Sequence, residues 1–214
     1  MVSLIFFIIA VGIFLLRKDC RREMVWSGLF TLPLFLLLPV FNQNFFEILD
    51  RGNIVHFLVQ IVGVFSIGAF VSAGYKFFFH RHLVRYKHPK SHLLAYLVVG
   101  PILLVILNFI PQIRFAYAIS ASLLLDMLIL VVIRNDLLVD AIFSGLVMAV
   151  TYGVSLIIQP YILPGRLNDF WFGPVSGLNL LFTPVEEIII IMLFGMLMGP
   201  LYAAVNDLFE RKFA

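Results

Sequence analysis

Seven apolar segments, separated by short polar stretches, constrain this chain more than any other feature of its sequence. They run at about residues 2–16, 24–41, 54–75, 92–110, 115–133, 137–163 and 174 or 184–205. Most of them approach the roughly 20 residues that a helix needs to cross a hydrocarbon core. Their long Leu, Ile, Phe and Val runs lack the alternation of a barrel strand. Since backbone groups in lipid must be paired within the segment, we predict an all-α, polytopic membrane helix bundle of about seven transmembrane helices.

The composition agrees with a single membrane domain. Hydrophobic residues make up 62% of the 214 residues and charged residues 13%, whereas soluble domains are roughly half apolar and a quarter charged. No linker or low-complexity tract divides the chain, so residues 1–214 form one transmembrane domain. The net charge of +3 comes from basic residues in short loops, which favours membrane lipid as the partner and argues against nucleic acid. Cys20 is the only cysteine, which excludes an intramolecular disulfide.

The loop charges predict an orientation. Lys and Arg accumulate on the cytoplasmic side of membrane proteins. With the N-terminus outside and the C-terminus inside, seven spans place most of the basic residues inside, namely Arg17, Lys18, Arg21, Arg22, Lys76, Arg81, Arg85, Lys87, Lys90, Arg134, Arg211 and Lys212. Only Arg51, Arg114 and Arg166 then lie outside. A six-span layout without the first segment would place the N-terminal basic cluster outside, so we prefer seven spans.

Two adjacent glutamates, Glu186 and Glu187, precede an unbroken apolar run at the start of the last segment. An acid inside a membrane is costly and is therefore a functional hypothesis that needs a partner. Thr183 and Glu186 have the spacing of a capping box, with Pro184 at the first helical position. Because each helical residue turns by about 100°, the two carboxylates should face different directions. We expect a capped, ionised Glu186 and a desolvated Glu187 that can donate a proton.

The role of Pro184 decides how deep these glutamates lie. If the helix begins at Pro174, Glu186 lies near the bilayer centre and Pro184 kinks the helix. If the helix begins at Pro184, residues 184–205 span the membrane alone and the carboxylates lie near the outer interface. The preceding segment would then be re-entrant or interfacial. The sequence leaves both alternatives open.

Other polar residues have competing interpretations. Asp126 is a candidate second acid, or it makes a helix–helix hydrogen bond. Asp136 and Asp140 supply only one fragment of a diphosphate-binding magnesium motif, so we interpret Asp136 as the N-cap of the sixth segment. Residues 80–92 contain four of the five histidines and are interpreted as a basic loop on anionic lipid headgroups. We expect no metal site.

Two stretches resemble a known family. The first runs from Phe170-Trp171-Phe172-Gly173-Pro174 to Pro184-Val185-Glu186-Glu187, and the second is the basic junction from Arg17 to Trp26. Both look like the integral-membrane carotenoid cyclases, the lycopene cyclase domain of archaea, actinobacteria and fungi, which carry a Pro-x-Glu-Glu signature. The resemblance implies an enzyme, an intramolecular lyase or isomerase of carotenoid biosynthesis, in a prokaryotic plasma membrane (cell inner membrane). No dinucleotide fingerprint occurs, so the similarity is to the cofactor-free cyclases.

The resemblance also implies a mechanism and a site. An acid protonates the terminal alkene of an acyclic, lycopene-like polyene, a neighbouring double bond attacks the cation, and a base removes a proton to leave a ring. Glu187 is assigned as the acid and Glu186 as the base or electrostatic stabiliser, with their interchange left open. The expected contacts to the polyene substrate are Trp171, Phe172, Asn179, Phe182, Thr183, Pro184 and Phe194.

Two other functions remain alternatives. Relatives often carry an acid before the proline of the second span, where this chain has Leu38 before Pro39. That departure favours a non-catalytic polyisoprenoid-binding or helper subunit that works in a homo- or hetero-oligomer. The other alternative is a proton-coupled transporter that uses Asp126, Glu186 and Glu187 as a relay.

Overall fold

The helices of the protein match the apolar segments of its sequence. A computed structural model describes residues 2–41, 54–79, 81–85, 98–110, 113–162, 176–180, 183–206 and 208–212. Within this part the seven α-helices are α1 (Val2–Leu16), α2 (Arg21–Phe41), α4 (Ile54–Phe79), α6 (Val99–Asn108), α7 (Phe115–Ile133), α8 (Leu138–Ile162) and α9 (Val185–Val205). Two short 3-10 helices, η1 (Lys18–Cys20) and η2 (Asn135–Leu137), join α1 to α2 and α7 to α8. The prediction of a mostly helical protein is confirmed.

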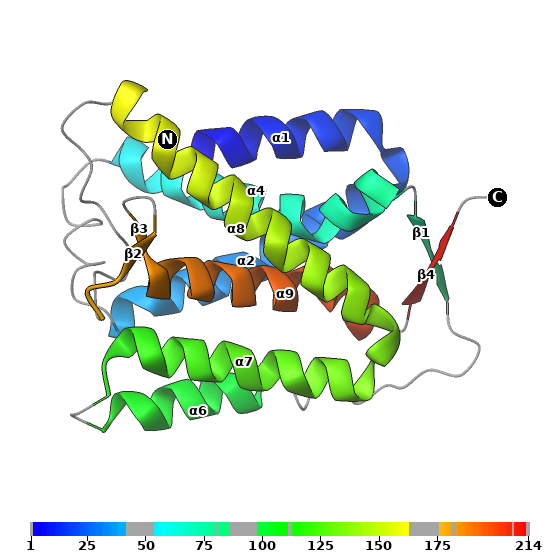
Figure 1. Ribbon diagram of the computed structural model, residues 1–214. Coiled ribbons are helices and arrows are strands. Elements are labelled where there is room, and N and C mark those ends of the chain that lie inside the picture. The colour runs from blue at the N-terminus through cyan, green and yellow to red at the C-terminus, as the bar shows by residue number, and fades with distance from the viewer. Residues whose placement is uncertain are drawn as a thin grey trace.

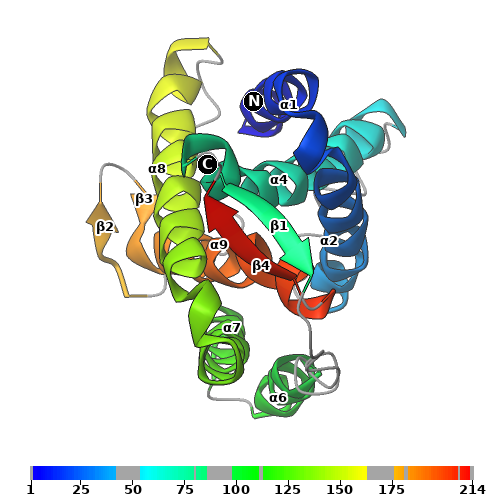
Figure 2. The same cartoon turned by 90° about the vertical axis from the view of Figure 1, so that its right-hand side faces the viewer.

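The bundle is built around α4, α8 and α9 (Figure 1). Helix α9 packs along α8 and also contacts α4 and α7, while α1 and α2 both lie on α4. Helix α6 packs on α7 at the edge of the bundle (Figure 2). The main core joins Phe6 of α1, Phe70 of α4, Met148 of α8 and Met198 of α9, all of them buried. These contacts explain why the central helices are apolar on most of their circumference.

Glycines allow α8 and α9 to approach closely. A Cβ atom at Gly195 would lie 2.7 Å from Cβ of Met148, and one at Gly199 would overlap the side chain of Ser144. Gly145 of α8 likewise faces Met192 and Met196 of α9. Small residues at helix contacts are typical of bundles in membranes, where close backbone packing replaces the hydrophobic effect.

Two small antiparallel sheets lie at the ends of the bundle (Figure 1). Strand β1 (Arg81–Arg85) pairs with β4 (Leu208–Lys212), and Arg81 lies opposite Lys212. Strands β2 (Asn179–Leu180) and β3 (Thr183–Pro184) form a short hairpin before α9. The prediction that the first part of the basic stretch 80–92 is a loop was therefore wrong, because residues 81–85 find a partner about 130 residues away near the C-terminus. The histidines at 80, 88 and 92 lie outside the described residues.

Four of the described helical segments are long and apolar enough to cross a membrane. They are Ile61–Phe78, Phe115–Ile133, Asn135–Ile158 and Val185–Val205. Residues 4–16 and helix α6 are apolar but shorter. The fourth predicted span, 92–110, contains a helix of only 10 residues, and at 1.5 Å per residue it measures roughly 15 Å. Residues 86–97 lie outside the described part of the chain.

The connections alternate between the two ends of the bundle. The α1–α2 turn, the α7–α8 turn and the β1–β4 sheet lie at one end, and the β2–β3 hairpin lies at the other (Figure 1). The first end carries Arg17, Lys18, Arg21, Arg22 and Arg134, together with the basic residues of β1 and β4. We call it the basic end.

Candidate functional site: buried acids at the start of α9

The last helix begins next to the glutamates. Helix α9 starts at Val185, and Pro184 is its N-cap, with φ −55° and ψ 131°. Of the two starts that the sequence allowed, the later one is therefore observed. The capping-box prediction was wrong, since the N-cap residue is Pro184, which makes no side-chain hydrogen bond, and Thr183 lies buried in β3. The β2–β3 hairpin sets the start instead, because the Val185 N–H donates to the Leu178 carbonyl over 3.1 Å.

Glu186 is held by a turn that folds over the start of α9. One of its carboxylate oxygens, Oε1, accepts a hydrogen bond from the backbone N–H of Ser176. The Ser176 hydroxyl in turn accepts from the N–H of Leu178, and Gly177 between them has φ +78°, a conformation that favours glycine. The second oxygen of Glu186 is buried without a hydrogen-bond partner among the described residues. This carboxyl is fixed by backbone and still has acceptor capacity.

Glu187 points into the protein and meets Tyr152. Its side chain is fully buried, and Oε1 accepts a hydrogen bond from the hydroxyl of Tyr152 on α8, which is itself buried. The two glutamates thus face different partners, as the helical rotation predicted. Tyr152 is a site residue that the sequence did not predict. A buried carboxyl bonded to a phenol can hold or release a proton without contact with bulk water.

Asp126 forms a separate contact on α7. It is buried, and its Oδ1 accepts a hydrogen bond from the N–H of Gly100 over 2.8 Å. That N–H belongs to the first turn of α6, where the helix itself supplies no acceptor. The observed bond is the helix–helix alternative of the sequence analysis, and it joins α6 to α7.

The remaining predicted contact residues are spread out. Thr183 and Pro184 are buried beside the glutamates, Asn179 is exposed on β2, and Phe194 is half-buried against the main core. Trp171, Phe172 and Phe182 lie outside the described residues.

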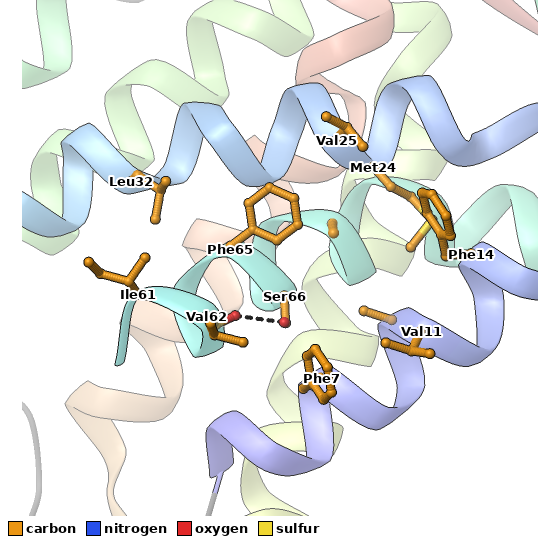
Figure 3. Close-up of a pocket in the computed structure, with 12 residues that line it drawn as sticks. Phe7, Val11, Phe14, Met24, Val25, Leu32, Ile61, Val62, Phe65 and Ser66 are labelled. Carbon is orange, nitrogen blue, oxygen red and sulfur yellow. Dashed lines mark hydrogen bonds between the residues drawn. The ribbon is translucent and has the colours of Figure 1, made fainter. Parts of the chain in front are cut away.

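A pocket of about 360 Å³ lies between α1, α2 and α4 (Figure 3). Its lining includes Phe7, Val11, Leu32, Val62 and Phe65, and neither glutamate belongs to it. This pocket is therefore separate from the buried acids at the start of α9.

A second group of buried charges lies at the basic end, opposite the glutamates (Figure 1). The ammonium of Lys76 on α4 lies 2.8 Å from Glu23 of α2 and 3.3 Å from Asp140 of α8, and all three side chains are at most 2% exposed. Ser144 donates to Asp140 over 2.9 Å. We call these three residues the Lys76 cluster. Lys76 directly follows the predicted span 54–75 and was counted among the loop residues, yet its position in the last turn of an apolar helix is a signal that it needs acidic partners.

The aspartate motif has a structural explanation. Asp136 lies inside η2 and accepts two hydrogen bonds of 3.0 Å from the guanidinium of Arg134, so its prediction as the N-cap of α8 was wrong. Arg134 is buried and also donates to the carbonyls of Ala204 and Leu208. Among the described residues no group of three or more His, Cys, Asp or Glu side chains could hold a metal ion.

The chain was compared with known protein families, curated proteins and solved structures. No family model, curated protein or solved structure that was compared with the chain matches it.

Proposed function

We propose that the protein is a carotenoid cyclase-like membrane enzyme that closes a ring at the end of an acyclic, lycopene-like polyene. The observation that carries the proposal is the buried pair of Glu187 and Tyr152 at the start of α9, beside a Glu186 that is fixed by backbone. Redox-neutral cyclisation requires one group that gives a proton and one that takes a proton back. Two adjacent carboxyls in different surroundings suit those two tasks.

In the proposed reaction Glu187 is the acid. Its carboxyl proton is transferred to the terminal alkene of the substrate, and a tertiary carbocation results. The π electrons of a nearby double bond form the new carbon–carbon bond, and Glu186 or a second base removes one proton from the cyclised cation. Product and substrate are isomers, so the step needs no oxidant and no cofactor. Burial supports the acid role because it disfavours a charged carboxyl.

The membrane arrangement belongs to the same proposal. Seven spans, with the N-terminus outside and the basic end in the cytoplasm of a prokaryotic cell, would place both glutamates near the outer interface of the plasma membrane. The alternating connections and the basic residues at one end support this layout. A hydrocarbon substrate would reach the site without leaving the bilayer.

The test is expression in cells that accumulate lycopene. We expect cyclised carotenoids with the wild type and unchanged lycopene with Glu187→Gln, both variants being present in the membrane in equal amounts. Asp19→Asn is the matched control, because Asp19 is an exposed acid of the α1–α2 turn, far from α9 along the chain. Only unchanged lycopene with the wild type would reject cyclisation of this substrate.

A proton-coupled transporter is the second candidate, because buried ionisable groups lie at both ends of the bundle. The Lys76 cluster at the basic end and the glutamates at the other end would be the two ends of a proton path. This function predicts proton uptake into proteoliposomes that is lost in Glu187→Gln. A non-catalytic helper would instead bind the polyene with neither activity.

A further inference from the structure

Helices α1 and α2 follow each other in the chain but diverge over α4. Both pack on α4, and the pocket of about 360 Å³ fills the space between them (Figure 3). We call it the α1–α2 pocket. Among the described residues its only polar lining side chain is Ser66, whose hydroxyl donates to the Val62 carbonyl over 2.6 Å within α4. The walls therefore offer nothing to water and suit an apolar occupant.

The α1–α2 pocket is open to the surroundings of the bundle. Four of its lining side chains are about two-fifths or more exposed, namely Phe7 (41%), Val11 (39%), Val25 (41%) and Val62 (46%). Since these helices are apolar, the medium around them is hydrocarbon if the bundle is inserted in a membrane. An apolar groove that opens to hydrocarbon is accessible to the acyl chain of a lipid.

The end of the α1–α2 pocket at the basic end is positively charged. The turn from Arg17 to Arg22 contains four basic residues and one acid, Asp19, a net charge of +3. Arg21 is half-buried, with its guanidinium carbon 5.0 Å from the ring centre of Phe14, a residue of the pocket wall. Its Nε–H donates to the Phe14 carbonyl over 2.7 Å. A cation is thus fixed at the place where the apolar wall ends.

We propose that the α1–α2 pocket binds one acyl chain of an anionic phospholipid, with the lipid phosphate against Arg21 and Lys18. The apolar walls suit an acyl chain, and the fixed guanidinium with the exposed Lys18 suits a negative headgroup. The site uses α1, η1, α2 and α4 and no residue of α9. It is therefore independent of the proposed cyclase reaction at α9.

Native mass spectrometry of the detergent-solubilised full chain tests the proposal, with phosphatidylglycerol and phosphatidylcholine of identical acyl chains as probes. We expect phosphatidylglycerol to bind more tightly, and Arg21→Gln to weaken it about fivefold, the effect of one basic residue at a membrane surface. Arg21→Lys should retain most of the binding. Arg22→Gln is the matched control, because Arg22 lies one turn before Trp26, which packs on Tyr202 of α9 instead of the pocket.

A second pair of variants tests the apolar part. Val11→Trp fills the pocket and should lower phosphatidylglycerol binding, whereas Ile8→Trp changes an exposed residue of the same helix that does not line the pocket. Glycerol phosphate should not compete. Equal binding of the two lipids, equal effects of the two arginine variants, or full competition by glycerol phosphate would each overturn the proposal. If Val11→Trp does not fold, the comparison of Arg21→Gln with Arg22→Gln still decides.

Discussion

The hydroxyl of Tyr152 ties α8 to Glu187 at the start of α9, and both groups are buried. Tyr152→Phe removes the donor and leaves a buried carboxyl oxygen without that hydrogen bond. Such a loss costs about 1–3 kcal/mol of unfolding free energy, and a comparable loss in the transition state slows turnover by about fivefold or more. Thermal unfolding and the lycopene assay measure the two effects. Tyr161→Phe, on the exposed side of the same helix, is the control. Identical stability of the two variants would contradict the contact.

Cys20 provides a prediction that does not depend on function. Its thiol is buried in η1, and burial, together with the nearby acid Glu23, raises its pKa to about 12. At pH 8 only about one molecule in ten thousand is then a thiolate, the form that reacts with maleimides. We expect no labelling of the folded protein at pH 8 and full labelling after denaturation. Lys18→Cys in a Cys20→Ser background should label rapidly, because residue 18 is exposed. Rapid labelling of native Cys20 would show that η1 is open.

For single residues, the sequence shows which side chains are unusual better than it shows which side chains they contact. The pair Glu186–Glu187 stands out because acids are rare in apolar segments, and its divergent orientation follows from helical rotation. Tyr152 does not stand out, since it is one of seven tyrosines in the chain. Its contact with Glu187 arises only because α8 packs on α9. Thr183 is the opposite case, a residue that the sequence singled out for a contact it does not make. Its spacing to Glu186 fits a capping box, but Thr183 pairs with Leu180 in the β2–β3 hairpin and the N-cap is Pro184.

The Lys76 cluster joins three helices at the basic end. Glu23 and Asp140 lie in the first turns of α2 and α8, and Lys76 lies in the last turn of α4, so each charge also matches its helix dipole. Lys76→Met leaves two buried carboxylates facing each other and should lower the unfolding free energy by about 3–5 kcal/mol. Unfolding in increasing SDS measures this loss.

The control for this cluster is Lys18→Met, which removes an exposed ammonium and should have little effect. A double variant, Lys76→Met with Glu23→Gln, should recover part of the loss, since only Asp140 then remains charged. If Lys76→Met unfolds like the wild type, the cluster does not hold these helices together.

The ends of a helix or strand can be predicted from the sequence where they depend on local residues alone. The ends of α1 and α7 match the predicted segments because polar residues follow the apolar runs directly. The β1–β4 sheet could not be predicted, because its strands are far apart in sequence and pair only after the bundle brings α4 and α9 together. The same reason hides the acidic partners of Lys76, which come from α2 and α8.

For the whole molecule, the fold gathers at one end several of the loops whose basic residues predict the proposed orientation. The positive-inside rule uses only the positions of Lys and Arg in the sequence. The fold brings the α1–α2 turn, the α7–α8 turn and the β1–β4 sheet to this end. Helix α6 has 10 residues in the described part of the chain, fewer than a crossing needs, and residues 86–97 before it lie outside that part. Its position therefore decides the topology.

Cysteine accessibility in intact cells distinguishes the layouts. In a Cys20→Ser background, seven spans with the N-terminus outside predict that Arg114→Cys reacts with a membrane-impermeant maleimide, since residue 114 is exposed between α6 and α7. Lys18→Cys should react only after the cells are permeabilised. If neither variant labels in intact cells, residues 18 and 114 lie on the same side of the membrane, which contradicts a fold in which α7 separates residue 114 from the basic end. If labelling is reversed, with residue 18 reactive and residue 114 protected, the basic end faces outward and the proposed orientation is wrong.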